Sequence, residues 1–275
     1  MAALVAVVAA TATGAASSNG DSRSTDDRGQ RAIGLGTDGK TLFSFRTDQG
    51  KKAKVLGAIR GLTGDTSLVG IDFRVQDGRL YGVGNAGGVY TVAGTRATRV
   101  SQLSTALSGT VFAVDFNPAA NRLRVVSDTG QNLRHNIDDG ATAGTTAVDG
   151  TLTYPPATAP VTSITGVGYT NNDLDPATAT TLFDVDVMLD QVAVQSPANS
   201  GSLAPTGKLG VDATRAGFDT FSELKDGRAV RNVGYAVLTD GRRSTIQRVD
   251  LLTGKATVST KIAYPVADLA VKLDR

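Results

Sequence analysis

The chain has 275 residues, with 28 Lys and Arg against 26 Asp and Glu, and it contains no cysteine. The absence of cysteine excludes disulfides, thiol nucleophiles and Cys-ligated zinc. A formal net charge of only +2, without a long basic run, argues against nucleic acid as a partner.

The N-terminal segment differs from the rest of the chain. Ala2 to Ala10 form a short apolar run, and small residues that suit a signal peptidase follow near Ala15. The run is too short to cross a bilayer as a stable helix, and a mobile Ala-rich tail is the alternative interpretation. We predict a signal peptide over residues 1–16, a disordered leader over 17–30 and one folded domain over 31–275. This arrangement indicates secretion or a place in the cell envelope, without a transmembrane segment.

Five similar stretches recur along the folded part. They are LVGIDFR (68–74), VFAVDFN (111–117), ITGVGYT (164–170), GFDTFSE (217–223) and VADLAVK (266–272). With Asp72, Asp115, Gly168, Asp219 and Ala270 as equivalent points, the spacings are 43, 53, 51 and 51 residues. Recurrence at such a period is typical of a repeat architecture.

Each repeat contains the pattern of four strands. A second strand pattern follows each of the first four stretches, and a later hairpin carries a glycine-bearing turn, which tight hairpins need. The C-terminal stretch lacks followers, whereas the chain from residue 31 offers three strands without a first one. We therefore predict an all-β, five-bladed β-propeller with four strands per blade, closed by the C-terminal strand joining the N-terminal blade. A β-sandwich is the alternative fold.

The segment 112–137 carries many polar residues within strand patterns. Arg122 and Arg124 alternate with apolar residues, and Asn132 and Arg134 do so in the next strand. Because blade faces pack on one another, we expect these arginines to pair with carboxylates and to hold adjacent blades together. The candidate partners are Asp115, Asp128 and Asp149.

The motifs VDFNP, RLRVVSDTGQNLR, DGTLTY, YTNN, TTLFDVD and GFD resemble a bacterial secreted family known as domain of unknown function 4394. The resemblance covers nearly all of residues 31–275. It implies a propeller-like fold and secretion, and it implies no activity. The resemblance assigns no roles to individual residues. The residues that belong to its motifs are Asp115, Asn117, Arg122, Arg124, Gln131, Asn132 and Arg134.

First strands line the channel of a propeller, so their polar residues should converge towards one mouth. These residues are Asp72, Asp115, Asn117, Tyr169, Asn171, Asn172 and Asp219. Their oxygens suit Ca²⁺, or a pair of catalytic carboxylates, or a channel that is merely solvated. Carboxylates held together repel unless a cation or an arginine neutralises them, and Arg122 and Arg124 are the arginines we expect to do so.

The functional hypothesis is a binding or scaffold module that uses the polar mouth of the channel. Its partner would be a small molecule, a glycan or a protein, and we expect a monomer. The alternative is a hydrolase or lyase for an extracellular sugar, ester or lactone, with Asp72, Asp115 and Asp219 as its reactive groups. We expect no cofactor, with Ca²⁺ as the open exception.

Overall fold

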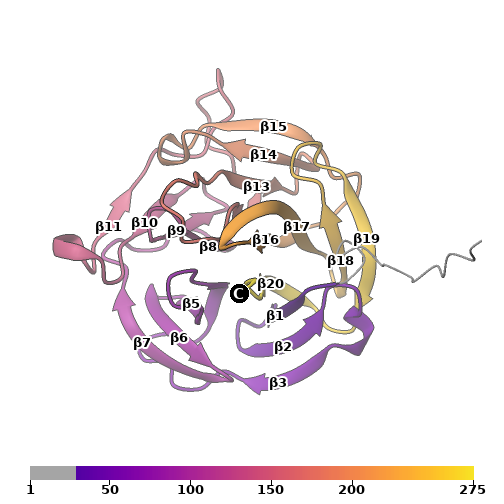
Figure 1. The fold of residues 1–275 in the computed structure, drawn as a ribbon, viewed down its shortest axis with the longest axis horizontal. Helices are drawn as coiled ribbons and strands as arrows, with labels where there is room; N and C mark the ends of the chain where they lie inside the picture. The colour runs from indigo at the N-terminus through magenta and orange to yellow at the C-terminus, as the bar shows by residue number, and fades with distance from the viewer. Residues whose placement is uncertain (1–28) are drawn as a thin grey trace, which may run out of the picture.

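The structure, a computed structural model, describes residues 29–275. These residues form five four-stranded antiparallel sheets around a central axis, seen end-on in Figure 1. The five-bladed β-propeller with four strands per blade is confirmed. The leader and signal peptide predicted at the N-terminus lie almost wholly outside the described residues.

The blades follow one another in chain order. Blade 1 has, from the axis outwards, the strands β20 (Val266–Val271), β1 (Arg31–Gly36), β2 (Thr41–Arg46) and β3 (Lys54–Ala58). Blade 2 has β4 (Leu68–Phe73), β5 (Leu80–Gly84), β6 (Gly88–Ala93) and β7 (Arg96–Gln102). Blade 3 has β8 (Phe112–Asn117), β9 (Arg122–Ser127), β10 (Asn132–His135) and β11 (Thr146–Val148).

The last two blades are built in the same way. Blade 4 has β12 (Ile164–Tyr169), β13 (Leu182–Asp186), β14 (Gln191–Gln195) and β15 (Leu203–Lys208). Blade 5 has β16 (Arg215–Lys225), β17 (Arg228–Asp240), β18 (Arg243–Val249) and β19 (Ala256–Ile262). Single 3₁₀ turns interrupt the connections at η2 (Gly50–Lys52), η3 (Gly140–Thr142) and η4 (Ala198–Ser200).

The two ends of the folded chain share blade 1. β20 pairs antiparallel with β1, with Gly34 opposite Leu269 and Ala32 opposite Val271. In Figure 1 the yellow β20 lies beside the indigo β1, next to the axis. The predicted closure is confirmed, and it leaves no blade without an inner strand.

The core consists of apolar layers between neighbouring blades. All six residues of β12 and of β20 are buried, because a first strand is covered by a blade on each side. β3, an outermost strand, is mainly exposed. One layer illustrates the pattern, since Tyr81 and Val83 of blade 2 pack with Phe116 and Leu123 of blade 3.

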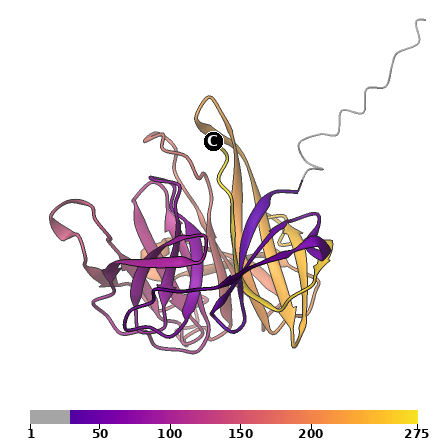
Figure 2. The same cartoon turned by 90° about the horizontal axis from the view of Figure 1, so that it is seen from below.

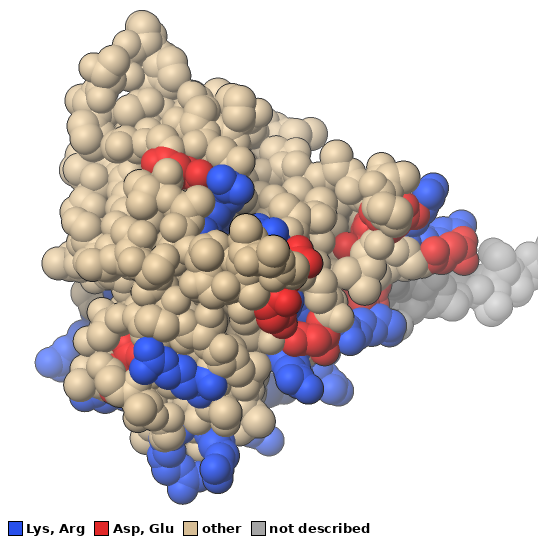
Figure 3. Space-filling view, turned by 90° about the vertical axis from the view of Figure 1, so that its left-hand side faces the viewer, with Lys and Arg blue, Asp and Glu red and all other residues tan. Residues whose placement is uncertain are grey.

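The disc carries one long projection. β16 and β17 have 11 and 13 residues, and their hairpin rises beyond the other strands on the side of the C-terminus (Figure 2). None of the helices in residues 29–275 is long and apolar enough to span a membrane. On the face shown in Figure 3, several basic side chains gather towards the lower edge, and acidic and basic side chains lie next to one another nearer the middle.

Candidate functional site

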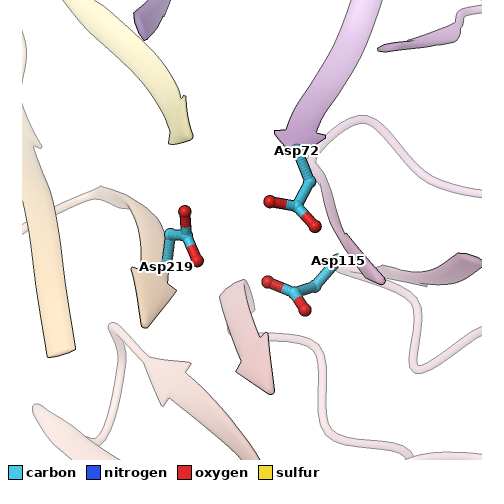
Figure 4. A group of neighbouring side chains, drawn as sticks. All are labelled: Asp72, Asp115 and Asp219. Carbon is cyan, nitrogen blue, oxygen red and sulfur yellow. The ribbon is translucent and has the colours of Figure 1, made fainter. Parts of the chain in front are cut away.

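Three aspartates of the first strands meet on the propeller axis. Asp72 of β4, Asp115 of β8 and Asp219 of β16 each offer a carboxylate oxygen, and these oxygens lie within 4.8 Å of one another. The three side chains point towards a common centre in Figure 4. They are only 6%, 2% and 3% exposed, so the convergence expected for these three residues occurs inside the channel rather than at a mouth.

Backbone hydrogen bonds orient these side chains. The inner edge of a first strand has no neighbouring strand, so its N–H groups need other acceptors. Each aspartate accepts such an N–H from the next blade: Phe116 N to Asp72 (2.8 Å), Tyr169 N to Asp115 (3.1 Å) and Val271 N to Asp219 (2.6 Å). In every case the donor follows the equivalent residue of the next strand by one position. These bonds support the equivalence of Asp72, Asp115, Gly168, Asp219 and Ala270 inferred from the spacing.

A fourth carboxyl group makes the same kind of bond, so that backbone N–H groups and side-chain oxygens link the first strands in a ring around the axis. Asp268 of β20 accepts hydrogen bonds from Ile71 N and from Leu269 N, both at 2.9 Å. At the remaining junction, the hydroxyl of Thr165 accepts from Ala216 N at 2.9 Å. Sequence reasoning missed Asp268, although it lies two residues before Ala270 and therefore on the same face of the strand.

Burial raises the pKa values of the carboxyl groups in this ring. It raises the pKa of Asp219 to about 7 and that of Asp268 to about 8. The pKa values of Asp72 and Asp115 lie well above the ordinary value, first because of burial and then because of repulsion from neighbouring carboxylates. Near neutral pH the ring must therefore hold protons or a cation. The oxygen set has the chemistry for Ca²⁺, but backbone donors already engage each carboxylate.

The arginines expected to neutralise this ring lie elsewhere, so that prediction was wrong. Arg122 pairs with Asp139 near the surface, with 2.9 Å between Nη1 and Oδ2. Arg124 stands opposite Asp115 in the β8–β9 register, yet its Nη1 lies 2.6 Å from Asp149 Oδ2. The long side chain runs away from the axis, while the short side chain of Asp115 reaches the backbone of β12.

Arg124 instead joins blade 3 to blade 4. Its guanidinium is 1% exposed, and it donates to Asn132 (2.7 Å), to the hydroxyl of Tyr169 (3.2 Å) and to Asn199 (2.8 Å). Arg134 adds a second guanidinium to Asp149, at 2.7 Å. Of the three carboxylates considered as partners, Asp149 is the one used, whereas Asp115 and Asp128 are not. The role in holding adjacent blades together agrees with the expectation for Arg124.

The other expected site residues do not join the axial group. Asn117 accepts from Ala120 N in the β8–β9 turn at 2.7 Å. Gln131 fastens the preceding loop by accepting from Ser108 N at 3.0 Å and donating to Ala106 O at 2.9 Å. The amide of Asn171 accepts a hydrogen bond from Asn232 of blade 5 at 2.7 Å.

Cavities lie at both ends of the channel. We call the first the start mouth, because the first strands begin there; it measures about 300 Å³ and is lined mainly by residues 36–39, 67–69 and 107–112 with Asn85, Arg215 and Ala267. The end mouth, of about 310 Å³, is lined by residues 75–76, 172–174 and 273–275 with Leu224 and Gly227. A wider groove of about 800 Å³ runs between blades 4 and 5 and contains Asn171 and Asn232.

The closed ring, its axial carboxylates and the two mouths define the molecule as a five-bladed β-propeller with a polar channel. The chain belongs to the family described as a domain of unknown function (DUF4394), whose model matches residues 41–270. No curated protein matches the chain.

Several solved structures resemble this chain. One is a protein of unknown function from Bacteroides thetaiotaomicron VPI-5482, with 15% identity and a TM-score of 0.47, covering 88% of this chain and 64% of that chain. An auxiliary nutrient binding protein from Bacteroides ovatus ATCC 8483 has 10% identity and a TM-score of 0.45, covering 89% and 62%. A chain of a nidogen/laminin complex has 10% identity and a TM-score of 0.49, covering 89% and 99%. The chain thus spans less than two thirds of the two Bacteroides proteins.

Proposed function

We propose that this propeller is a binding module that takes its ligand at the start mouth of the channel. The observation that supports it is the cavity itself, whose wall includes residues of β4, β8, β16 and β20 from four blades. A concave, partly polar cavity on the axis of a rigid ring is a favourable place for a small ligand, because little of its wall must be ordered on binding.

The other cavities support this function less well, because their polar groups already serve one another. In the wide groove, Asn171 and Asn232 share a hydrogen bond, and Arg231 lies 4.0 Å from Glu223. At the end mouth, Asp173 accepts from Ala229 N at 2.8 Å and Asp274 from Leu224 N at 2.9 Å. A ligand there would have to displace contacts that hold the protein together.

The alternative is a hydrolase or lyase that uses the axial carboxylates. Their mutual distance of at most 4.8 Å is short enough for cooperation between two carboxyl groups. Their burial and their bonds to backbone N–H groups favour binding over catalysis, since a substrate must reach a reactive group. Turnover of a sugar, ester or lactone that disappears in Asp115→Asn would establish the alternative.

The composition of the N-terminal residues supports a location outside the cytoplasm. We propose that the protein is exported to the cell envelope or secreted, on the composition of residues 1–16 and the absence of cysteine from a chain of 275 residues. Mass spectrometry of the mature N-terminus, together with fractionation of the producing cells, tests this location. An intact Met1 on protein recovered from the cytoplasm would contradict it.

Ligand titrations of the ¹⁵N-labelled protein test the binding site. A panel of sugars, amino acids and small acids should contain compounds that shift the amide signals of Gly39, Ser67 and Gly109. Val69→Phe, which narrows the mouth, should weaken those shifts, whereas Val100→Phe on the outer strand β7 should not. Ligands that shift only signals from the wide groove would contradict the proposal. Light scattering would check the expected monomer.

A further inference from the structure

Arg215 brings an incompletely paired guanidinium to the start mouth. It is the first residue of β16, and its Nε donates to Ala267 O of β20 at 3.1 Å. Among residues 29–275, the structure records no second hydrogen bond from this guanidinium and no ion pair to it within 4 Å. Arginine offers five N–H donors in a planar fork, so Nη1 and Nη2 remain available to a ligand.

The carboxylates nearest to this guanidinium have other donors. Asp268 and Asp128 act on Arg215 electrostatically, but without direct contact. Asp128 accepts from the backbone N–H and the hydroxyl of Thr110, at 2.9 and 2.5 Å. Asp38, which lines the mouth, accepts from Lys40 N and Thr41 N at 2.8 and 2.9 Å. These carboxylates thus accept from backbone N–H groups and from threonine hydroxyls rather than from Arg215.

Asn85 adds further donors on the same wall. Its Oδ1 accepts from Thr66 N at 2.8 Å and from Ser67 N at 3.1 Å. Because two backbone donors need this oxygen, the orientation of the amide is settled, and the NH₂ group is turned away from them. In the described part of the chain, no acceptor is recorded for that NH₂ group.

The start mouth, a cavity of about 300 Å³, therefore has donors on Arg215 and Asn85 for which no acceptor is recorded among residues 29–275. We propose that it selects ligands that carry a carboxylate, with Arg215 as the principal contact and Asn85 as the second. A carboxylate has only acceptors, and its two oxygens match the guanidinium fork. This inference rests on the proposed binding function and specifies its ligand class.

The competing explanation is that Arg215 only offsets the charge of the axial carboxylates. In that case the mouth would not distinguish a carboxylate from a neutral ligand of the same shape. Succinate and its neutral analogue succinamide separate the two explanations, and inorganic phosphate shows whether another oxyanion is accepted.

Titrations of the full chain, followed by ¹⁵N–¹H spectra and calorimetry, provide the test. Succinate should shift the signals of Gly39, Ser67 and the Asn85 side chain saturably, and bind at least about tenfold more tightly than succinamide, as a charge-assisted pair would give. Arg215→Gln should remove this preference. Lys225→Gln takes one positive charge from the opposite end of the same strand, and it should leave binding unchanged.

A second variant covers the case in which Arg215→Gln fails to fold. Asn85→Asp keeps an oxygen for Thr66 N and Ser67 N but replaces the NH₂ group with negative charge, so it should abolish succinate binding in a folded protein. Equal binding of succinate and succinamide, or full binding by Asn85→Asp, would overturn the inference. Neutral sugars that shift the start-mouth signals while succinate does not would preserve the binding function and refute only the carboxylate preference. If no probe shifts these signals, both proposals fail.

Discussion

Two groups of buried carboxyl groups in this molecule are stabilised by different partners. Between blades 3 and 4, Asp149 lies 2.6 Å from Arg124 and 2.7 Å from Arg134, so its charge is matched by two guanidinium groups. On the axis, Asp72, Asp115 and Asp219 lie together without such a contact, and backbone N–H groups are their recorded donors.

The difference lies in what each group of residues holds in place. Arg124 joins side chains of two blades, and an arginine guanidinium keeps its charge throughout the ordinary pH range. The axial aspartates join first strands through the backbone, and their raised pKa values make them depend on protons or on a cation. Stability of the axis should therefore respond to pH near neutrality. On the blade 4 side of Arg124, burial raises the pKa of Asp184 and the charge of Arg124 lowers it, so this carboxyl group adds a response of its own.

Removing the closing strand should have the largest effect. A chain that ends after Tyr264 loses β20, and with it Asp268 and the N–H that Asp219 accepts. Buried Val266, Leu269 and Val271 contribute roughly 1.5–3 kcal/mol each, so we expect the truncated chain to be unfolded at 25 °C. Circular dichroism and urea unfolding measure this. A chain that ends after Val271 keeps β20 and should stay folded; equal stability of the two chains would contradict the ring closure.

Breaking the blade interface should cost less. Arg124→Ala leaves Asn132 and Asn199 without their donor and opens a cavity beside Asp149, so we expect a loss of about 3 kcal/mol in the free energy of unfolding. Arg122→Ala is the control, because its pair with Asp139 is partly exposed and should contribute less than about 1 kcal/mol. Urea unfolding compares them, and equal losses would show that burial of the pair does not matter.

The axial carboxyl groups should make the stability of the protein depend on pH. Folded Asp219 and Asp268 have pKa values of about 7 and about 8, above the ordinary value of 3.8, so the folded state binds more protons than the unfolded state. Their stabilising contribution is full below about pH 4 and is lost as the pH rises through 7 and 8. Burial lowers the pKa of His135 from its ordinary value of 6.5, so this group reduces the stability of the folded state only below about pH 6.5. Above that pH, His135 does not contribute to the pH response.

We therefore expect the free energy of unfolding, measured with chelator present, to fall from pH 6.5 to pH 8.5. Each group that binds a proton only in the folded state contributes a slope of about 1.4 kcal/mol per pH unit. Asp268→Asn should flatten the upper part of this profile. Arg124→Ala should lower the whole curve and extend its fall to higher pH, because the charge of Arg124 lowers the pKa of buried Asp184. A flat profile for the unmodified protein would contradict protonation of the axis.

Much of this architecture was predictable because it repeats. The spacing of Asp72, Asp115 and Asp219 placed them at one register of successive blades, and the ring then brought them together. The partner of Arg124 was not predictable in this way. A long side chain opposite Asp115 has several carboxylates within reach, and the sequence pattern does not say which way it extends.

The start mouth was harder still to predict. Arg215 precedes the stretch GFDTFSE and belongs to no repeated pattern, and Asn85 lies in a turn of another blade. Their proximity depends on how the blades close around the axis. Donors at the mouth lack acceptors because the oxygens of Asp38, Asn85 and Asp128 already accept from backbone N–H groups, and a sequence pattern does not show such contacts.

The smallest expected effect is also the one that separates protons from a cation on the axis. Asp115→Asn keeps an oxygen for Tyr169 N but removes one of the clustered charges. If protons hold the axis together, Ca²⁺ at about 10 mM, above the affinity range of extracellular calcium modules, should leave the melting temperature of both proteins unchanged. The variant should then be more stable at pH 8 by up to about 1 kcal/mol, because one fewer carboxyl group must stay protonated.

If Ca²⁺ binds, it should raise the melting temperature of the unmodified protein alone, and chelator should reverse the change. Asp139→Asn, which removes an exposed carboxylate, controls for general effects of charge. We expect the first result, since each axial carboxylate already accepts a backbone N–H; a calcium-dependent rise would overturn it and identify the axis as a metal centre.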